Sequence, residues 1–165
     1  MFQIRKFKPA DAQACWPLFH DTVRRVNCRD YTPEQVNAWA HAGIDPAPWL
    51  RRFEGHFAYV AEHAEAIVGF ADLTIEGYLD RLFVSADHQR RGIASILLDA
   101  IELAAMEHNV RRIHTQSSIT AKPFFISRGY VVLKEQIVDC RGVGLTNFVM
   151  ERKIFIREGH SRSDQ

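Results

Sequence analysis

Two kinds of hydrophobic pattern divide the first part of the chain. Residues 2–7 (FQIRKF) alternate apolar and polar side chains, which predicts a half-buried strand. From Pro9 to about Cys28 the apolar residues instead recur every three or four positions, which predicts a helix. Because proline lacks the backbone N–H that a helix interior needs, Pro17 either kinks this helix or marks the point near which it begins.

A second helix is predicted to begin within the segment YTPEQVNAWA (31–40). Thr32 can cap this helix, Pro33 suits its first position, and Glu34 favours the positive end of its dipole. The apolar residues that would share one face are Val36, Trp39 and Ala40. Residues 45–53 (DPAPWLRRF) predict a further short helix or a turn.

The middle of the chain is rich in strand patterns. Residues 56–84 contain short polar turns near 62–65 and near 76–77, which predicts a three-stranded meander. A helix is predicted over 92–108, because apolar residues follow helical spacing there. Its predicted buried stripe consists of Ile93, Ile96, Leu97, Ala100, Ile101 and Ala104.

The last part of the chain combines short strands with one short helix. Residues 111–117 predict a strand, 121–129 a short helix closed by glycine, and 130–140 and 146–154 a final pair of strands. The polar stretch 157–165 is expected to be frayed. The whole order implies a mixed sheet, in which the long helix in the middle of the chain connects two parallel, neighbouring strands.

Composition agrees with one soluble domain and excludes several functions. A length of 165 residues favours a single domain with its own core. The formal net charge of +1, from 21 basic and 20 acidic residues, lacks the basic excess of nucleic-acid-binding proteins. No apolar run reaches the roughly 18 residues that a membrane span needs, and the N-terminal sequence lacks the apolar core of a signal peptide. We therefore expect a cytoplasmic protein without nucleic-acid or membrane partners.

Cysteine and histidine residues give no sign of a metal centre in the sequence. The three cysteines, at positions 15, 28 and 140, are too few and too widely spaced for a disulfide framework or a zinc site, and we expect them to be reduced. None of the eight histidines lies in a ligand motif such as HExxH. We therefore expect no bound metal. The sequence also lacks the Gly-x-Ser-x-Gly elbow of a serine hydrolase.

The stretch FVSADHQRRGIASILL (83–98) joins a strand end to a helix through a polar turn. A helix start offers unpaired backbone N–H groups and the positive end of the dipole, which together attract anions. Gly92 and Ala94 are small enough to let a ligand approach the backbone, while Arg90 and Arg91 add positive charge. The stretch is neither a Walker A motif nor a Rossmann fingerprint. From residue chemistry alone, a phosphate cradle and a basic surface loop fit it equally well.

The same stretch resembles the coenzyme-binding segment of the GNAT (Gcn5-related N-acetyltransferase) superfamily. In that family a strand leads through [QR]-x-x-G-x-[GA] into a helix, and Gln89, Gly92 and Ala94 fill the three defined positions here. The resemblance implies that the preceding strand binds the pantetheine arm of acetyl-CoA through the backbone of Leu82, Phe83 and Val84. The residues that it assigns to pyrophosphate binding are Gln89, Arg90, Arg91, Gly92, Ile93, Ala94 and Ser95.

A second family segment lies downstream. GNAT chains often carry N-x-x-A-x-x-[LF]-Y-x-x-x-G-[FY], and this chain reads SITAKPFFISRGY over 118–130. Ser118 stands where asparagine is usual, and Phe125 stands where the family often has the tyrosine that protonates the leaving thiolate. The resemblance places both positions beside the acetyl-CoA arm. The matching residues are Ala121, Phe124, Gly129 and Tyr130.

Four separated segments, spread between residue 2 and about 154, resemble the YafP-like acetyltransferases of this superfamily. They are YTPEQVNAWA, DRLFV…QRRGIAS, SITAKPFF and CRGVGLTNFVM. The resemblance implies one α/β (mixed α+β) domain over 1–155 and a polar tail over 156–165. It also implies a mostly antiparallel central sheet that is splayed between strands 4 and 5 and carries helices on both faces.

The activity that this resemblance implies is N-acetyl transfer from acetyl-CoA to a primary amine of a small molecule. The amine would attack the thioester directly in a ternary complex, with coenzyme A as product and no metal. Two alternatives stay open: an acyl-CoA-binding sensor or interaction domain with weak catalysis, and an N-acetyltransferase for proteins or peptides. Aromatic residues around 31–49 favour a closed pocket for a small substrate. The chain is expected to be a monomer or a homodimer.

Direct transfer needs a base that takes a proton from the substrate ammonium group. Asp80 is the preferred base, and Glu76 in the preceding turn is the second candidate. A structural alternative is an ion pair of Asp80 with Arg81 or Arg112. Alternation along the strand would place Asp80 on one face with Tyr78, Leu82 and Val84.

An acid that protonates the departing thiolate is harder to assign. Phe125 cannot donate a proton, and Tyr130 is expected to be a core residue. Tyr78 could reach the site from the same strand as the proposed base, and a water molecule could also serve. We keep Tyr78 as the candidate catalytic acid.

The acceptor pocket is expected near the first helices and the last strands, where the family usually forms it. Tyr31 and Trp39 are candidate lining residues of this pocket. The alternative for Trp39 is packing in the core, and the alternative for Tyr31, which precedes the helix cap, is an exposed position, which we expect. The segment DCRGV could present Cys140 and Arg141 at the mouth of the pocket. Alternatively it is a hairpin turn in which Gly142 supplies the bend.

Overall fold

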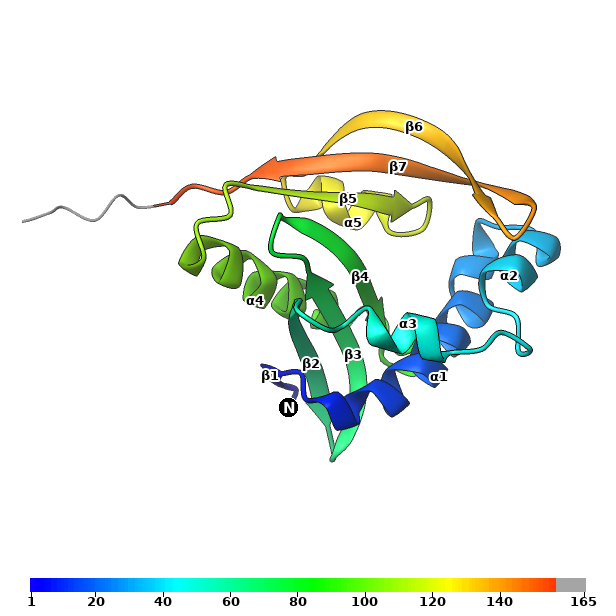
Figure 1. Cartoon of the computed structure of the whole chain (residues 1–165), viewed down its shortest axis with the longest axis horizontal. Coiled ribbons are helices and arrows are strands. Elements are labelled where there is room, and N and C mark those ends of the chain that lie inside the picture. The colour runs from blue at the N-terminus through cyan, green and yellow to red at the C-terminus, as the bar shows by residue number, and fades with distance from the viewer. Residues whose placement is uncertain (157–165) are drawn as a thin grey trace, which may run out of the picture.

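A single sheet of seven strands runs through the protein, as a computed structural model that describes residues 1–156 shows (Figure 1). The strand order is β1-β2-β3-β4-β5-β7-β6. All neighbouring strands are antiparallel except β4 and β5, which are parallel, so the predicted mixed topology is confirmed. The strands are β1 (Gln3–Lys6), β2 (Phe57–His63), β3 (Ala66–Leu73), β4 (Tyr78–Val84), β5 (Arg112–Ser118), β6 (Val131–Cys140) and β7 (Val143–Lys153).

The sheet splits where β4 and β5 meet. These two strands pair only through Tyr78 with His114 and Leu79 with Thr115, and beyond that point they diverge. Figure 1 shows the resulting wedge between the β1–β4 part and the β5–β7 part. The predicted splay between the fourth and fifth strands is therefore confirmed, and so is the β2-β3-β4 meander.

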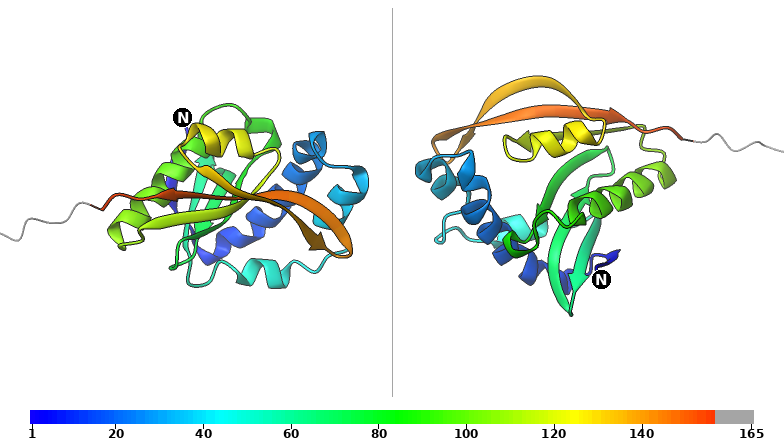
Figure 2. Two further views of the ribbon diagram at one scale, coloured as in Figure 1. Left: turned by 90° about the horizontal axis from the view of Figure 1, so that it is seen from above. Right: turned by 180° about the vertical axis from the view of Figure 1, so that it is seen from behind.

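Helices cover both faces of the first part of the sheet (Figure 2). Phe70 of β3 packs into a core cluster with α1, whereas its neighbour Ala71 packs into a second cluster with α4. Successive residues of one strand thus face the two helical layers, as a strand of period two requires. The helices are α1 (Ala12–Arg25), α2 (Pro33–Trp39), α3 (Ala47–Arg51), α4 (Ile93–Glu107) and α5 (Lys122–Ser127), with short 3-10 turns η1 (Pro9–Asp11), η2 (Asn27–Arg29) and η3 (Ala86–His88).

The ends of the first two helices follow from their sequences. Thr32 accepts a hydrogen bond from the Gln35 N–H at 3.2 Å, and the Gln35 side chain accepts one from the Thr32 N–H at 2.9 Å, which forms a complete capping box at the predicted start of α2. Pro17 lies inside α1, which begins five residues earlier at Ala12. The alternative that this helix begins near Pro17 is therefore wrong.

The buried stripe of α4 differs from the prediction at its edge. Ile96 was expected in the core but is 37% exposed, whereas Leu98 and Ala105 are fully buried. The reason is that α4 packs against β2, β3 and β4 together, so that the buried arc is wider than a single helical stripe and is rotated toward those two residues.

The predicted frayed tail, 157–165, lies outside the described residues. The final strand ends at Lys153, and the domain boundary at residue 155 stays a prediction. Across the described part of the chain, every helix is too short or too polar to cross a membrane.

Candidate active site

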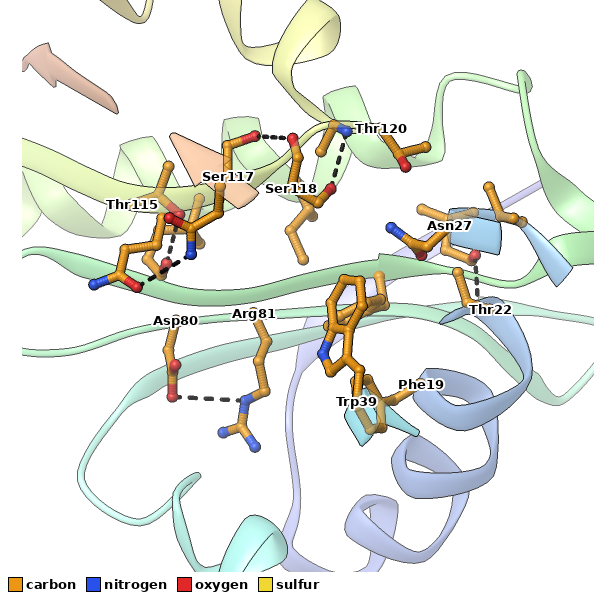
Figure 3. A pocket seen from close by; sticks show the side chains of 18 of the residues that line it. Phe19, Thr22, Asn27, Trp39, Asp80, Arg81, Thr115, Ser117, Ser118 and Thr120 are labelled. Atoms are coloured by element: carbon orange, nitrogen blue, oxygen red, sulfur yellow. Dashed lines mark hydrogen bonds and ion pairs between the residues drawn. The ribbon is translucent and has the colours of Figure 1, made fainter. Parts of the chain in front are cut away.

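A cleft of about 910 Å³ occupies the wedge between β4 and β5 (Figure 3). One side of it is formed by β4 and the turn that leads into α4, and the other by β5 and the start of α5. Residues of α1, α2 and α3 and of the β6–β7 hairpin close its far end. The segments of the chain that the sequence singled out thus meet in one place.

The start of α4 has the backbone features that an anion cradle requires. The backbone N–H groups of residues 90–95 have no hydrogen-bond acceptor among the described residues. Gly92 has φ +80°, and a Cβ added there would meet nothing within 4 Å, so the backbone is open to the cleft. Free amides at the positive end of a 15-residue helix suit a phosphate group. Between the two alternatives left by residue chemistry, this geometry favours the cradle.

The side chains of the cradle have different roles. The Gln89 amide donates to the backbone oxygen of Val84 at 2.7 Å and to that of Ser85 at 3.2 Å, so it braces the turn. Ile93 is buried in the core and offers the cleft only its backbone. Arg90 lines the cleft, whereas Arg91 is exposed and lies outside the lining. The lining also includes Ala94 and Ser95.

A β-bulge places the candidate base. Leu73 of β3 pairs with Leu79, but its neighbour Asp72 pairs with Arg81, so Asp80 has no partner on β3. The side chains of Asp80 and Arg81 consequently point the same way, as Figure 3 shows. The predicted alternation is therefore wrong: Leu82 and Val84 pack on the α4 side of the sheet, while Asp80 meets Arg52 from the α3 end.

The backbone of β4 beyond the bulge is open toward the wedge. The Ser85 N–H donates to the Val68 oxygen of β3 at 2.8 Å, and alternation then turns the backbone groups of Phe83 toward β3 as well. The backbone groups of Leu82 and Val84 point instead into the gap. The Val84 oxygen is already engaged, because it accepts from Gln89 and from the Thr22 hydroxyl at 3.1 Å.

Asp80 lies in an ion pair that the sequence did not predict. Its carboxylate accepts a hydrogen bond from Arg52, the residue directly after α3, and only 6% of its side chain is exposed. Arg81 is a weaker neighbour at 3.8 Å, and Arg112 pairs elsewhere, with Glu151 at 2.7 Å. Arg52 could not be identified from the sequence, because it is 28 positions away from Asp80 and on another element.

A buried network of charged residues next to the bulge holds it in place. Asp72 is fully buried and accepts from Arg81 through Nε at 2.9 Å and Nη2 at 2.6 Å. His56 contacts the same carboxylate at 2.6 Å. The Arg81 guanidinium also lies over the rings of Trp49 and Phe53, at 4.5 and 3.9 Å from their centroids. The position of Arg81, and with it that of the bulge, is thus held from several sides.

The same acidic groups do not form a convincing metal site. One ligand atom each of His56, Asp72 and Asp80 lies within 4.8 Å of the others. Two guanidinium groups, of Arg81 and Arg52, already neutralise these carboxylates, so a divalent cation would meet strong repulsion there. The expected absence of a metal stays a prediction.

The other candidates for proton transfer differ in position. Glu76 is exposed in the β3–β4 turn and does not line the cleft. Tyr78 does line it, and burial, together with the nearby charge of Asp80, raises the pKa of its hydroxyl. A raised pKa keeps the Tyr78 proton in place at neutral pH, as a proton donor requires.

The segment 118–130 forms the opposite side of the cleft. The Ser118 hydroxyl accepts from the Ala121 N–H at 3.0 Å, which stabilises the turn into α5. Phe125 lines the cleft but is 3% exposed and packs on the Tyr130 ring at 5.2 Å. Tyr130 is buried, as expected, and its hydroxyl lies 3.3 Å from Glu102.

The far end of the cleft is aromatic. Trp39 lies 6.5 Å from Phe19 and from Phe83, measured between ring centroids, and also faces the cleft, so both of its predicted roles apply. Trp16 and Trp49 line the same end but were not singled out from the sequence, where their apolar spacing indicates only helix packing. The aromatic wall combines residues of three helices, so the sequence of a single helix does not reveal it.

Tyr31 corrects a second expectation. It is 7% exposed rather than exposed, and its hydroxyl donates to the Thr146 oxygen at 2.7 Å and accepts from the Ile119 N–H at 2.9 Å. The cause is tertiary: the β7 strand folds back over the start of α2 and covers the ring.

The β6–β7 hairpin closes the far end of the cleft. Gly142 has φ +82° and supplies the bend. Cys140 and Arg141 line the cleft, so this segment is both a turn and part of the pocket mouth. Arg141 donates to the Ala38 oxygen at 2.9 Å, which ties the hairpin to α2.

The chain is similar in sequence to known acetyltransferases. A family model described as an acetyltransferase (GNAT) domain matches residues 27–152. Over 151 residues the chain is 38% identical to the uncharacterized N-acetyltransferase YafP of Escherichia coli strain K12, and the match covers 92% of this chain and 95% of that protein.

Solved structures with the same fold extend this likeness. A GCN5-related N-acetyltransferase from Rhodopseudomonas palustris superposes with a TM-score of 0.87 and 30% identity, over 92% of this chain and 94% of that chain. The PaiA N-acetyltransferase from Thermoplasma acidophilum, solved in complex with coenzyme A, gives a TM-score of 0.70 at 17% identity, over 93% and 99% of the two chains. At this lower identity the likeness shows a common fold.

Proposed function

The chain belongs to the GNAT family and is an N-acetyltransferase, and from this premise we propose that it moves an acetyl group from acetyl-CoA to a primary amine of a small molecule. The observation that carries the proposal is the juxtaposition of two features in one cleft. Free backbone amides at the start of α4 suit a pyrophosphate, and a buried carboxylate, Asp80, lies along β4 from them.

Acetyl-CoA fits the residues that are present. The amides of residues 90–95 would hold the pyrophosphate, assisted by Arg90, and the open backbone edge of Leu82 and Val84 would run beside the pantetheine arm. The relative from Thermoplasma acidophilum was solved with coenzyme A, which supports this choice of donor. Phe125 and Ser118 would border the arm from the α5 side.

The transfer itself needs little more than positioning and proton removal. Asp80 accepts a proton from the substrate ammonium group, directly or through water, and the neutral amine attacks the thioester carbonyl. A C–N bond forms, the C–S bond breaks, and the thiolate leaves as coenzyme A. Tyr78, whose hydroxyl stays protonated at neutral pH, is the proposed donor to that thiolate, with water as the alternative.

Arg52 regulates access to this base. It pairs with the Asp80 carboxylate from the end of α3 and is half exposed, so it can move, whereas Asp80 itself is almost covered. An entering ammonium group carries the same charge as Arg52 and can replace it beside Asp80. The base would thus be shielded until an amine arrives.

A small acceptor is favoured by the form of the far end. Aromatic rings from three helices and the β6–β7 hairpin enclose it, and Arg141 fastens the hairpin to α2. An extended peptide would require an open groove in that direction. We therefore propose a small amine rather than a protein as the acceptor.

One observation favours a second candidate function. Phe125 occupies the position of the usual proton-donating tyrosine and is buried in the core, so it supplies neither a proton nor a polar contact. A protein with this change could bind acyl-CoA as a sensor or interaction domain and catalyse transfer only weakly.

Thiol release from acetyl-CoA, measured across a panel of amines, amino acids and peptides, tests the proposal. We expect release above the hydrolysis background with one or more small primary amines and not with peptides. Coenzyme A binding without release for any acceptor would support the sensor function instead. Release only with peptides would contradict the small-molecule assignment.

A further inference from the structure

Asn27 is a buried polar residue to which the proposed chemistry assigns no role. It lies in η2, directly after α1, and is only 6% exposed. Its side-chain amide has no hydrogen-bond partner within residues 1–156, yet it lines the cleft, and Figure 3 shows it pointing inward. Because this amide opens onto the cleft without a partner in the protein, its donor and its acceptor are both available to a ligand that lies there.

The neighbours of Asn27 place it at the donor end of the cleft. Thr22, on the last turns of α1, donates to the Val84 oxygen at 3.1 Å and so fixes the end of α1 beside the end of β4. Asp80 lies four residues earlier on this strand, which corresponds to about 13 Å along an extended chain. Because Asn27 follows Thr22 by five residues, it belongs to the part of the cleft beside Val84, along which the pantetheine arm is proposed to run, rather than to the part beside Asp80.

At Val84 the strand edge offers an amide of that arm a free N–H but no free oxygen. The Val84 oxygen, which faces the gap, already accepts hydrogen bonds from Thr22 and Gln89. The Ser118 hydroxyl, across the cleft, is engaged with the Ala121 N–H. The N–H of a secondary amide passing here would need an acceptor from another side chain, and a primary amide offers one together with a second donor.

We propose that Asn27 pairs with an amide of the pantetheine arm and binds acetyl-CoA from the α1 side of the cleft. The assignment rests on the proposed function and adds a donor-binding residue to it. No covalent step is involved: Asn27 holds the arm against β4 while Asp80 acts on the amine.

A structural role for this side chain is not supported by its contacts. In the turn, the Asp30 N–H donates a hydrogen bond to the backbone oxygen of Asn27 at 3.0 Å, and the Asn27 side chain takes no part in it. Replacement by leucine, which has a similar volume, keeps that backbone bond. Asn27→Leu should therefore fold with unchanged or slightly higher stability.

The test compares binding of coenzyme A with binding of 3′,5′-adenosine bisphosphate, which lacks the pantetheine arm, by calorimetry. Asn27→Leu and Asn27→Ala are the variants, and Asn37→Leu, at an exposed asparagine of α2, is the matched control. We expect both Asn27 variants to weaken coenzyme A about tenfold, which is the value of one or two hydrogen bonds, and to leave the bisphosphate unchanged. The KM for acetyl-CoA should rise while the KM for the acceptor stays constant.

Three results would overturn the assignment. Equal coenzyme A affinity in the Asn27 variants and the control would show that the amide does not touch the arm. Equal weakening of both ligands would show a general change in the cradle, and a rise in the acceptor KM alone would place Asn27 in the acceptor site. If the unaltered protein bound no coenzyme A, the proposed function would fail and this assignment with it, whereas unchanged affinity in the variants leaves the proposed function intact.

Discussion

The two sides of β4 are built differently: one offers backbone groups to a ligand, and the other consists of paired charged side chains. On the α4 side, the cradle offers backbone amides, a glycine and small side chains, and it commits few side-chain groups before a ligand arrives. On the α3 side, the charged wall of Asp80, Arg81, Asp72, His56 and Arg52 consists of two hydrogen-bonded groups, Arg52 with Asp80 and His56 and Arg81 with Asp72, joined by the ion pair between Arg81 and Asp80. The cradle can recognise phosphate with almost any side chains, whereas each member of the charged wall depends on the others.

This difference predicts opposite responses to mutation. Changes in the cradle should affect coenzyme binding more than stability. Changes at the buried pair of the charged wall, Asp72 and Arg81, should affect stability first. Removal of one of these two charges leaves the other buried and uncompensated.

The largest effect is expected for Arg81→Leu. Asp72, fully buried, would lose its bidentate partner, and we expect the free energy of unfolding to fall by about 3–5 kcal/mol in a urea titration. Arg112→Leu is the matched control, because its pair with Glu151 is largely exposed and should contribute at most about 1 kcal/mol. Equal losses in the two variants would remove the distinction between the wall and an ordinary surface pair.

Gly92→Val tests the cradle. The positive φ makes any β-branched residue unfavourable by about 1–2 kcal/mol, and the added side chain would occupy the space over the free amides. Gly55→Val is a close control, because Gly55 has φ +73°, also has open space around it, and does not line the cleft. We expect similar losses of stability but a coenzyme A affinity at least tenfold lower only for Gly92→Val. The same affinity in both variants would contradict the cradle.

Tyr31→Phe tests a structural contact that lies outside both the cradle and the charged wall. Its hydroxyl joins β7 to the turn before α5, and its loss should reduce stability by about 1–2 kcal/mol, measured by denaturant unfolding. Tyr59→Phe should have almost no effect, because the Tyr59 hydroxyl has no hydrogen bond to any residue in the described part of the chain. A small effect at position 31 would show that the hydrogen bonds of this hydroxyl do not hold the hairpin in place.

The smallest effect concerns the two arginines of the turn. Arg90 lines the cleft and Arg91 does not. At low salt we expect Arg90→Gln to weaken coenzyme A about fivefold and Arg91→Gln less than about twofold, since single exposed charges contribute little. The reverse order, measured by calorimetry, would mean that the turn changes conformation when the coenzyme binds.

The same contrast explains what the sequence could reveal. The cradle is local: Gln89, Gly92 and Ala94 lie within six residues, and backbone chemistry at a helix start requires that spacing. The order of elements along the chain and the cap residue at the start of α2 were likewise predictable, because hydrophobic period and cap residues are local signals, whereas the splay followed from the family resemblance.

The charged wall could not be predicted because its parts are distant in the chain. Arg52 and His56 lie in the connection between α3 and β2, whereas Asp72 is on β3 and Asp80 on β4, and no spacing rule connects these segments. The bulge at Asp80 adds one unpaired residue to β4, so the side chains on its two sides no longer alternate as the sequence predicts. Tyr31 and Asn27 are buried only because β7 and β4 pack over them, which no pattern in their own segment could indicate.

The central claim is that this cleft binds acetyl-CoA in the cradle and removes the amine proton through Asp80. The direct test is Asp80→Asn, with turnover and coenzyme A affinity measured on the same preparation. We predict that turnover falls about 10²–10⁴-fold, the usual contribution of a general base, while coenzyme A affinity stays within about twofold of its original value. Unchanged turnover in a variant that still binds coenzyme A would contradict the account.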